Sequence, residues 1–263
     1  MDKHWTERLF IDSAQLYGPM LEERVQQAKD TTPGLVSIFS DFNVPPGALM
    51  LDLACGIGRY SVALAEKGYT VVGVDLSVAF INRAKEMAAE RGVAERCDFR
   101  VGDMRQIGKV LRSQKEKFKV VLILFTSIGY YDEETDRQVL KQLLGLTAPK
   151  GVLIIDTLNR DWLVRHFRPS DFGRRGDGQV LVQEMLFNLE NSRMESVWGF
   201  YQQEDRGLRH LFSLNIDQRV YSLHELRRQV EESGWNYQTR YGGYNKEPFI
   251  TDSNRLVLIA QKP

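Results

Sequence analysis

The chain has 263 residues, and its 35 Lys and Arg residues balance 35 Asp and Glu residues, so the formal net charge is zero. This length predicts one core with an elaboration rather than two full domains. The hydrophobic content of 43% excludes a disordered chain, and the neutral charge excludes a general electrostatic attraction to nucleic acid or to anionic membranes.

Few features of the sequence suggest export, a membrane or a metal. Cys55 and Cys97 have no paired spacing, which excludes a disulfide scaffold and a cysteine zinc site. The first ten residues lack the apolar core of a signal peptide, and no apolar run approaches the roughly 20 residues that cross a bilayer. The histidines at 4, 166, 210 and 224 are scattered, so no metal is expected. We therefore expect a cytoplasmic protein.

Helical and strand patterns alternate through the first 157 residues. Residues 1–42 are predicted to be mostly helical, because apolar residues recur there at spacings near three and four. After the helix-breaking stretch NVPPG at 43–47, buried strands are predicted at 48–54, 70–75, 97–103, 118–125 and 151–157. Helices are predicted at 59–68, from a cap at Ser77 to about Gly92, and at 136–146. This order is typical of parallel βαβ units with helices on both faces of a sheet.

The pattern changes after residue 157. Runs rich in β-forming residues at 180–187, 193–201 and 208–216, joined by the turn-like ENSR and EDRG, predict a three-stranded antiparallel meander. Its aromatic and aliphatic residues alternate, so one face must be covered, by the carboxyl edge of the main sheet or by a second copy of the protein. We expect this β insertion, residues 180–217, to cover an acceptor pocket or to form a dimer interface, in a monomer or a homodimer.

The last 40 residues complete the main sheet. Ser222 is expected to cap a helix, and the runs NYQTRY at 236–241 and RLVLIAQK at 255–262 supply two more strands. The sequence therefore predicts a single α/β domain over 1–263, with a doubly wound, mostly parallel sheet, a β insertion and a helical N-terminal cover over 1–42.

The stretch LDLACGIGRY at 51–60 carries the main functional signal. Gly56 and Gly58 follow a strand and precede a helix, so they allow a tight turn in which backbone approaches a ligand at the carboxyl edge of the sheet. Asp75 ends the second strand 19 residues after Gly56 (75 − 56), where an acidic residue hydrogen-bonds ribose hydroxyls. Together these features predict a ligand that contains a nucleoside.

NAD or FAD would be the first candidate for that ligand. However, Ser61 stands where the dinucleotide fingerprint has Gly or Ala. Asp52 within the first strand is also unusual for such a site, because a buried carboxylate needs a partner. It could hold the amides of the loop or meet a cationic amino group of the ligand.

The motifs LDLACGIGR, VVGVDLS, VGDM and LTAPKGVLIIDT resemble those of the class I S-adenosylmethionine-dependent methyltransferases, and the match spans most of the chain. The resemblance implies a seven-stranded sheet with an antiparallel last strand, and S-adenosylmethionine as methyl donor. It implies that the methionine part contacts Asp52, Ala54, Gly56 and Gly58, and that Arg59 also belongs to the cofactor site. It implies that the ribose contacts Asp75, with Leu76 and Ser77 beside it, that adenine contacts Asp103 and Met104, and that Phe125 and Thr126 line the methyl-donating centre.

Several of these residues also have structural interpretations. Asp52 and Asp75 could be caps, and Asp103 could belong to an ordinary turn. Cys55 is interpreted as a packing residue rather than a nucleophile. Trp5, Phe10 and Tyr17 could pack an N-terminal helix, or cover the donor site as such a helix often does in the family.

The acceptor side is less defined. Tyr17, Tyr130 and Asn159 are our candidate catalytic residues; Tyr131, Asp156 and Arg160 lie near them in the sequence, and one of Asp156, Asn159 and Arg160 is expected to touch substrate. No N/D-P-P-Y/F run follows the fourth strand and no Pro-Cys pair is present, which argues against two kinds of nucleic-acid base methylation.

We expect in-line methyl transfer to a small molecule rather than to nucleic acid, with a further resemblance, through TSIGYY and the β insertion, to small-molecule N-methyltransferases. Two alternatives stay open. One is an RNA or protein methyltransferase, and the other is a non-catalytic module that binds the cofactor.

Overall fold

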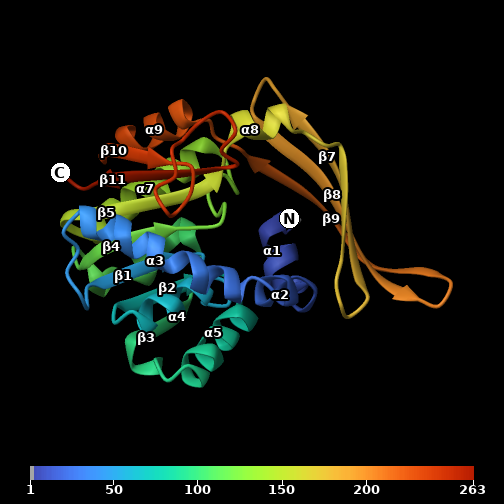
Figure 1. The fold of residues 1–263 in the computed structure, drawn as a ribbon, viewed down its shortest axis with the longest axis horizontal. Coiled ribbons are helices and arrows are strands. Elements are labelled where there is room, and N and C mark those ends of the chain that lie inside the picture. The colour runs from blue at the N-terminus through green and yellow to red at the C-terminus, as the bar shows by residue number, and fades with distance from the viewer. Residues whose placement is uncertain (1–2) are drawn as a thin grey trace.

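The computed structural model describes residues 3–263, so residues 1–2 of the expected N-terminal cover lie outside the described part. Two β-sheets form the framework, and the N-terminal helices α1 and α2 lie between them (Figure 1). No helix within residues 3–263 has both the length and the apolarity needed to cross a membrane.

The larger sheet has seven strands in the order β10-β11-β5-β4-β1-β2-β3. Its strands are β1 (Leu49–Leu53), β2 (Thr70–Asp75), β3 (Cys97–Val101), β4 (Phe118–Ile123), β5 (Thr147–Leu158), β10 (Asn236–Tyr241) and β11 (Arg255–Gln261). Strand β11 is antiparallel to both of its neighbours, whereas the pairs among β1 to β5 are parallel. The predicted fold, including an antiparallel last strand, is confirmed.

Helices cover both faces of this sheet, as the alternating pattern predicted. They are α3 (Val25–Asp41), α4 (Arg59–Glu66), α5 (Val78–Glu90), α6 (Ile107–Val110), α7 (Glu133–Leu146) and α9 (Leu223–Glu232), with short 3-10 turns at Ala94–Arg96, Met104–Gln106 and Arg112–Gln114. The short helix α8 (Arg160–Arg165) follows β5 and has no buried residue. Apolar side chains of α3 and α4 pack on one face, and those of α6, α7 and α9 pack on the other. Local capping fixes two starts, because Ser77 accepts from the Phe80 amide and Ser222 forms a capping box with Glu225.

The strand order reverses between β1 and its neighbours. Strand β1 pairs with β2 on one side and with β4 on the other, although β4 comes three strands later in the chain. Crevices at such reversals are where open α/β sheets bind ligands. The segments that follow β1, β2 and β4 therefore converge at the carboxyl edge of the sheet.

The second sheet is antiparallel and has four strands, in the order β6-β7-β8-β9. They are β6 (Ser170–Arg174), β7 (Gln179–Asn188), β8 (Arg193–Glu204) and β9 (Gly207–Arg219). The sequence analysis missed β6, so its bounds of 180–217 and its count of three strands were wrong. All five residues of β6 are exposed, and a strand without a buried face has no apolar alternation to reveal it.

The apolar face of the β6–β9 sheet packs on the N-terminal helices of the same chain, over α1 (Trp5–Glu7), a π-helical turn (Arg8–Asp12) and α2 (Ala14–Glu22). The buried residues of this sheet-helix cluster are Trp5, Leu9, Leu181, Phe200, Leu214 and Ile216. The Trp5 indole also donates to the Asp217 carbonyl (3.1 Å). The sequence analysis did not name these helices as a partner of the apolar face, and a dimer interface through the same strands stays a prediction.

A β-bulge changes which residues of β9 share the covered face. The register shifts between Phe200 and Tyr201, opposite β9. In an unbroken strand, Leu208 and Leu214 would share a face; here Leu214 is buried and Leu208 is 48% exposed.

Phe200 tests how much the sheet-helix cluster contributes to stability. It is 0% exposed, and a buried Phe→Ala change typically costs about 3–5 kcal/mol. We expect Phe200→Ala to lower the free energy of urea unfolding by that amount. Leu208→Ala, in the exposed part of the same sheet, should change it by about 0.5 kcal/mol or less. Similar losses for the two variants would contradict the assignment of Phe200 to a core.

Candidate active site

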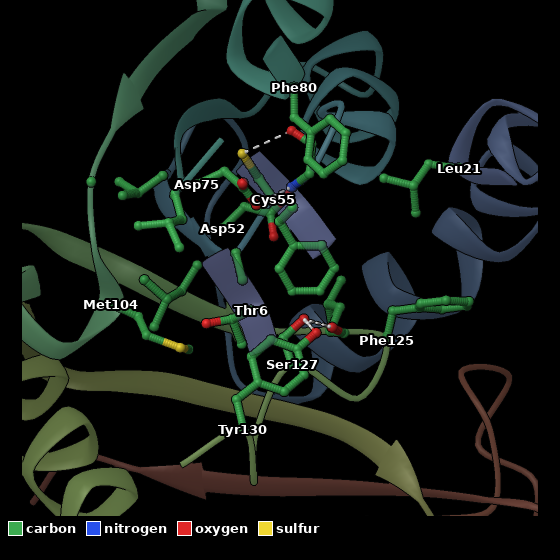
Figure 2. A pocket seen from close by; sticks show the side chains of 18 of the residues that line it. Thr6, Leu21, Asp52, Cys55, Asp75, Phe80, Met104, Phe125, Ser127 and Tyr130 are labelled. Carbon is green, nitrogen blue, oxygen red and sulfur yellow. Dashed lines mark hydrogen bonds between the residues drawn. The ribbon is translucent and has the colours of Figure 1, made fainter. Parts of the chain in front are cut away.

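A cavity lies at the carboxyl edge of β1, β2 and β4, and the empty space within it and at its mouth is about 800 Å³. Nine of the expected donor contacts line it: Asp52, Ala54, Gly56, Arg59, Asp75, Leu76, Asp103, Met104 and Phe125. Figure 2 shows Asp52, Asp75 and Cys55 on one side of the cavity and Thr6, Ser127 and Tyr130 on the other.

The two glycines of the loop after β1 have different roles. Gly56 has a φ of 56° and lines the cavity, where backbone is open to a ligand. Gly58 has a φ of 76° and does not line the cavity; a Cβ there would lie 2.8 Å from the Ala84 Cβ. Gly58 therefore permits close packing of the loop on α5, and the structure gives it no direct place at the ligand.

Asp75 is a buried carboxylate with one backbone donor on each oxygen. Its Oδ2 accepts from the Gly56 amide (2.8 Å) and its Oδ1 accepts from the Ser77 amide (2.9 Å). Burial raises the pKa of Asp75, whereas these hydrogen bonds and Arg59 act to lower it. Each carboxylate oxygen can accept more than one hydrogen bond, so Asp75 can still accept from ligand hydroxyls.

Asp52 has a partner that the sequence analysis did not name. The Ser61 hydroxyl donates to its Oδ2 at 2.6 Å. Burial raises the pKa of Asp52 to about 6, and the Ser61 hydrogen bond opposes that shift. Ser61, noted only as a departure from the dinucleotide fingerprint, was the available signal for this contact.

Asp103 is held in place by Arg105. The Arg105 amide donates to Oδ1 (2.8 Å), and the Arg105 guanidinium pairs with Oδ2 (2.6 Å). Arg105 also lies 3.6 Å from Glu7 of α1 and stacks on the Tyr131 ring. Arg105 thus links the loop after β3 to the N-terminal helices.

Arg59 is the buried cation of the site. It is 7% exposed, lines the cavity, and its guanidinium lies 4.6 Å from the centroid of the Phe125 ring. Among residues 3–263, no Asp or Glu forms an ion pair with it. A buried charge is costly without a partner, so the site fits a ligand that carries an anionic group toward Arg59.

The opposite wall joins the N-terminal helices to the loop after β4. Thr6, Phe10, Tyr17 and Leu21 line the cavity from the first side, and Ser127, Tyr130 and Tyr131 line it from the second. The Thr6 and Tyr131 hydroxyls are 3.3 Å apart, and the Phe10 ring centroid is 5.8 Å from that of Tyr130. Burial raises the pKa of both Tyr17 and Tyr130, so these phenols are neutral donors near pH 7.

No residue of 180–217 lines this cavity. The β6–β9 sheet stands one layer behind it, where Trp198 lies 6.3 Å from the Tyr17 ring. The expected direct cover of the acceptor pocket by the insertion is therefore not seen, because the N-terminal helices occupy that position.

Some predicted residues have structural roles away from the cavity. Ser77 caps α5, and Thr126 lies beside the cavity without lining it. Asn159 caps α8 through the Asp161 amide and donates to the Ser253 carbonyl, so it is not brought to the site. Arg160 bonds to Ser192. Of the candidate catalytic residues, only Tyr17 and Tyr130 reach the cavity.

The cavity-lining residues that the sequence analysis missed include Thr6, Leu21 and Ser127, on the wall formed by the N-terminal helices and the loop after β4. Leu21 is one of the regularly spaced apolar residues of the N-terminal segment. Such spacing predicts that a residue is buried, but it does not indicate which part of the protein buries it. No sequence pattern pointed to Thr6 or Ser127 as site residues, because a single hydroxyl residue is equally typical of a turn or a helix cap.

The loop after β4 is also fixed by a buried carboxylate that was not predicted. Asp136 of α7 accepts from the Gly129 amide (3.0 Å) and from the Tyr221 hydroxyl (2.7 Å). Burial raises the pKa of Asp136 to about 7. A Cβ on Gly129 would lie 2.1 Å from the Arg219 carbonyl oxygen, so this loop also fits closely against the end of β9.

Comparison with known proteins gives consistent results. Residues 50–151 match the family model of a methyltransferase domain. The chain is 30% identical over 224 residues to the tRNA 5-carboxymethoxyuridine methyltransferase of Escherichia coli (strain K12), covering 83% of this chain and 82% of that protein. It is 24% identical over 225 residues to the putative methyltransferase YqeM of Bacillus subtilis (strain 168), covering 84% and 86%.

A solved structure supports the fold. The S-adenosylmethionine-dependent methyltransferase from Clostridium acetobutylicum ATCC 824 superposes with a TM-score of 0.76 at 16% identity, covering 95% of this chain and 98% of that one. At that identity the likeness concerns the fold alone.

The pKa of Asp136 predicts a pH-dependent stability. Because it is raised from 3.8 to about 7, the protonated form favours folding; this contribution is complete below about pH 4 and is lost as the pH rises through 7. Asp136→Asn cannot ionise, so between about pH 5 and pH 8.5 its urea midpoint should fall less than that of the wild type. At about 1.4 kcal/mol per pKa unit, the difference should be at most a few kcal/mol.

Asp132→Asn is the control, since the pKa of exposed Asp132 is lowered by its capping hydrogen bonds to Thr135. It should not flatten the profile. A wild type and an Asp136→Asn variant with parallel pH profiles would show that Asp136 does not titrate in this range.

Proposed function

The chain belongs to the class I S-adenosylmethionine-dependent methyltransferases, and on this basis we propose that it methylates a small molecule enclosed beneath its N-terminal helices. S-adenosylmethionine is the methyl donor. The observation that carries the proposal is the cavity itself, which the α1–α2 segment closes against Ser127, Tyr130 and Tyr131. An acceptor that reacts there must be small, or must insert a small part into the cavity.

The donor is proposed to lie along the loops after β1, β2 and β3. Asp75 would accept from ribose hydroxyls, and Asp103 and Met104 would face the adenine. Arg59 would pair with the donor's carboxylate, because it is a buried guanidinium with no carboxylate partner among residues 3–263. These three kinds of group, on neighbouring strand ends, fit the three parts of S-adenosylmethionine.

The chemistry needs little from the protein beyond enclosure and alignment. When bound, S-adenosylmethionine supplies an electrophilic methyl group on a sulfonium, which an acceptor lone pair displaces in line. Holding two reactants in such an arrangement can supply on the order of 7–11 kcal/mol. The N-terminal helices exclude water, and the neutral hydroxyls of Tyr17 and Tyr130 are placed to orient an acceptor by hydrogen bonds.

RNA is the second candidate acceptor. The expectation that nucleic acid is not a partner is not supported, because a relative of 30% identity is a tRNA methyltransferase. A single nucleoside turned out of an RNA strand could also reach an enclosed cavity. We favour a small-molecule acceptor over RNA, because the described residues that line the cavity include a single arginine and no lysine. Such a lining offers little positive charge to an RNA backbone.

Transfer of a labelled methyl group distinguishes the two acceptors. The protein would be incubated with methyl-labelled S-adenosylmethionine and either a protein-free metabolite extract or purified total tRNA. We expect label in the small-molecule fraction, and none in tRNA beyond the level of a control with Asp75→Ala protein. Label in tRNA alone would overturn the small-molecule assignment and keep the methyltransferase.

Arg59→Met tests the proposed place of the donor's carboxylate. A hydrogen-bonded charged pair contributes roughly 1.5–3 kcal/mol, so the variant should bind S-adenosylhomocysteine roughly 10- to 150-fold more weakly by calorimetry. Binding of 5′-methylthioadenosine, which lacks the carboxylate, should change little. Arg24→Met is the matched control, because Arg24 also lies on the Phe125 ring (4.7 Å) but is exposed and does not line the cavity. Equal losses for the two ligands would place the carboxylate elsewhere.

A further inference from the structure

The segment after β4 contains two adjacent residues in an unusual backbone conformation. Phe125 has a φ of 56° and Thr126 a φ of 65°, both in the left-handed region that side chains other than Gly disfavour. Phe125 lines the cavity, and Ser127 beyond the pair lines it as well. Strained backbone of this kind persists only where surrounding contacts over-determine it.

Asp156 of β5 supplies the first of those contacts, through its side-chain carboxylate and its backbone carbonyl. The Phe125 amide donates to Oδ2 of Asp156 (2.9 Å), and the Thr126 amide donates to the Asp156 carbonyl (2.9 Å). A single residue of the neighbouring strand therefore binds both amides of the left-handed pair. Asp156, one of three residues among which a substrate contact was expected, is buried beneath the turn.

An ion pair holds that carboxylate in place. Arg255 of β11 donates to both oxygens of Asp156, at 2.8 Å and 2.6 Å, and the Tyr244 hydroxyl donates to Oδ2 at 2.6 Å. The remaining Nη1 of Arg255 donates to the Thr126 hydroxyl (3.0 Å). Arg255 thus reaches both the carboxylate and the turn that the carboxylate binds.

The last contact comes from the inserted sheet. Gln218, near the end of β9, donates through its side-chain nitrogen to the Thr126 carbonyl (2.8 Å) and to the Ile128 carbonyl (3.2 Å). Through Gln218, the β6–β9 sheet is hydrogen-bonded to the backbone that follows Phe125. Within residues 3–263, both hydrogen bonds of the Gln218 side chain go to this segment and not to the loops after β1, β2 and β3.

We propose that Gln218 is a positioning residue for methyl transfer, which together with Asp156 and Arg255 holds the Phe125–Thr126 turn in its left-handed form. We call these three residues the turn clamp. The turn sets the place of Phe125 against Arg59 and of Ser127 on the acceptor wall. The inserted sheet therefore acts on the reaction through the backbone of this turn rather than as a cover. This inference rests on the proposed position of the acceptor beside the loop after β4.

Gln218→Ala removes both donations without touching the cavity lining. Amide exchange of a peptide spanning residues 124–130, followed by mass spectrometry, should become at least tenfold faster. The S-adenosylhomocysteine dissociation constant should change less than threefold, because Gln218 contacts none of the donor-binding loops. The initial rate of methyl transfer into the metabolite extract should fall at least tenfold.

Gln202→Ala is the matched control. Gln202 lies on β8 of the same sheet and likewise donates to a backbone carbonyl, that of Asp177 (3.1 Å), far from the cavity lining. It should leave exchange at 124–130, donor binding and transfer rate within twofold of the wild type. Thermal unfolding of both variants would separate a general loss of stability from a local effect.

A compensating variant separates positioning from simple structural support. Glycine adopts the left-handed conformation without steric cost, so Thr126→Gly should make the turn less dependent on Gln218. In the Gln218→Ala/Thr126→Gly double variant, we expect slow exchange at 124–130 to return, together with at least half of the rate that Gln218→Ala lost.

Two outcomes would overturn the proposal: unchanged exchange at 124–130 in Gln218→Ala, or faster exchange with an undiminished transfer rate. If the wild type transfers no methyl group to the extract, the small-molecule assignment fails. The exchange measurement, which needs no acceptor, still decides whether Gln218 holds the turn.

Discussion

The arrangement of the whole molecule depends on the covering of one apolar surface. The β6–β9 sheet has an aromatic and aliphatic face that cannot stay in water, and the N-terminal helices bury it through the cluster around Trp5 and Phe200. Because the same helices have a second side, this packing also places Phe10, Tyr17 and Leu21 over the carboxyl edge of the large sheet. The cavity is enclosed because two distant parts of the chain share one hydrophobic core.

Among the charged side chains at the cavity, the carboxylates have hydrogen-bond or ion-pair partners within the protein, whereas one guanidinium has no carboxylate partner. Asp75 has the Gly56 and Ser77 amides, Asp52 has Ser61, and Asp103 has Arg105. Arg59 lies over the Tyr60 and Phe125 rings and forms no ion pair within residues 3–263, although its charge acts on Asp52 and Asp75 from a longer distance. An unpaired buried charge destabilises the protein. The carboxylates already have partners and can stay in place when a ligand enters, whereas the guanidinium can gain an anionic partner from the ligand.

The backbone of the site is strained where ligands would meet it. Ala54, Phe125 and Thr126 have positive φ without being glycine, and such conformations cost on the order of 1–3 kcal/mol each. For Phe125 and Thr126 the offsetting contacts come from β5, β11 and β9, and thus from three segments far apart in the chain. The inserted sheet is in this respect part of the site's support, even though none of its side chains lines the cavity.

The sequence by itself determined the seven-stranded sheet, the glycine loop, the acidic residue that ends β2 and the family of the chain. These follow from local patterns: the period of apolar residues defines strands and helices, and the spacing from Gly56 to Asp75 is fixed by one βαβ unit. Ser77 and Ser222 could be predicted as caps for the same reason, because a cap bonds within three residues of itself.

Only the tertiary structure decided which segments of the chain pack against one another. Strand β6 has no buried face and left no pattern, and the packing of residues 5–21 on residues 181–216 joins segments that no local rule relates. The partners of Asp156, Asp136 and Gln218 are likewise set by where whole strands and helices pack, not by nearby residues. Hydrogen-bond spacing along the chain is a local property, whereas burial against a distant segment is a property of the assembled core. The cavity-lining loops after β1, β2 and β3 could therefore be found in the sequence, and the opposite wall of the cavity could not.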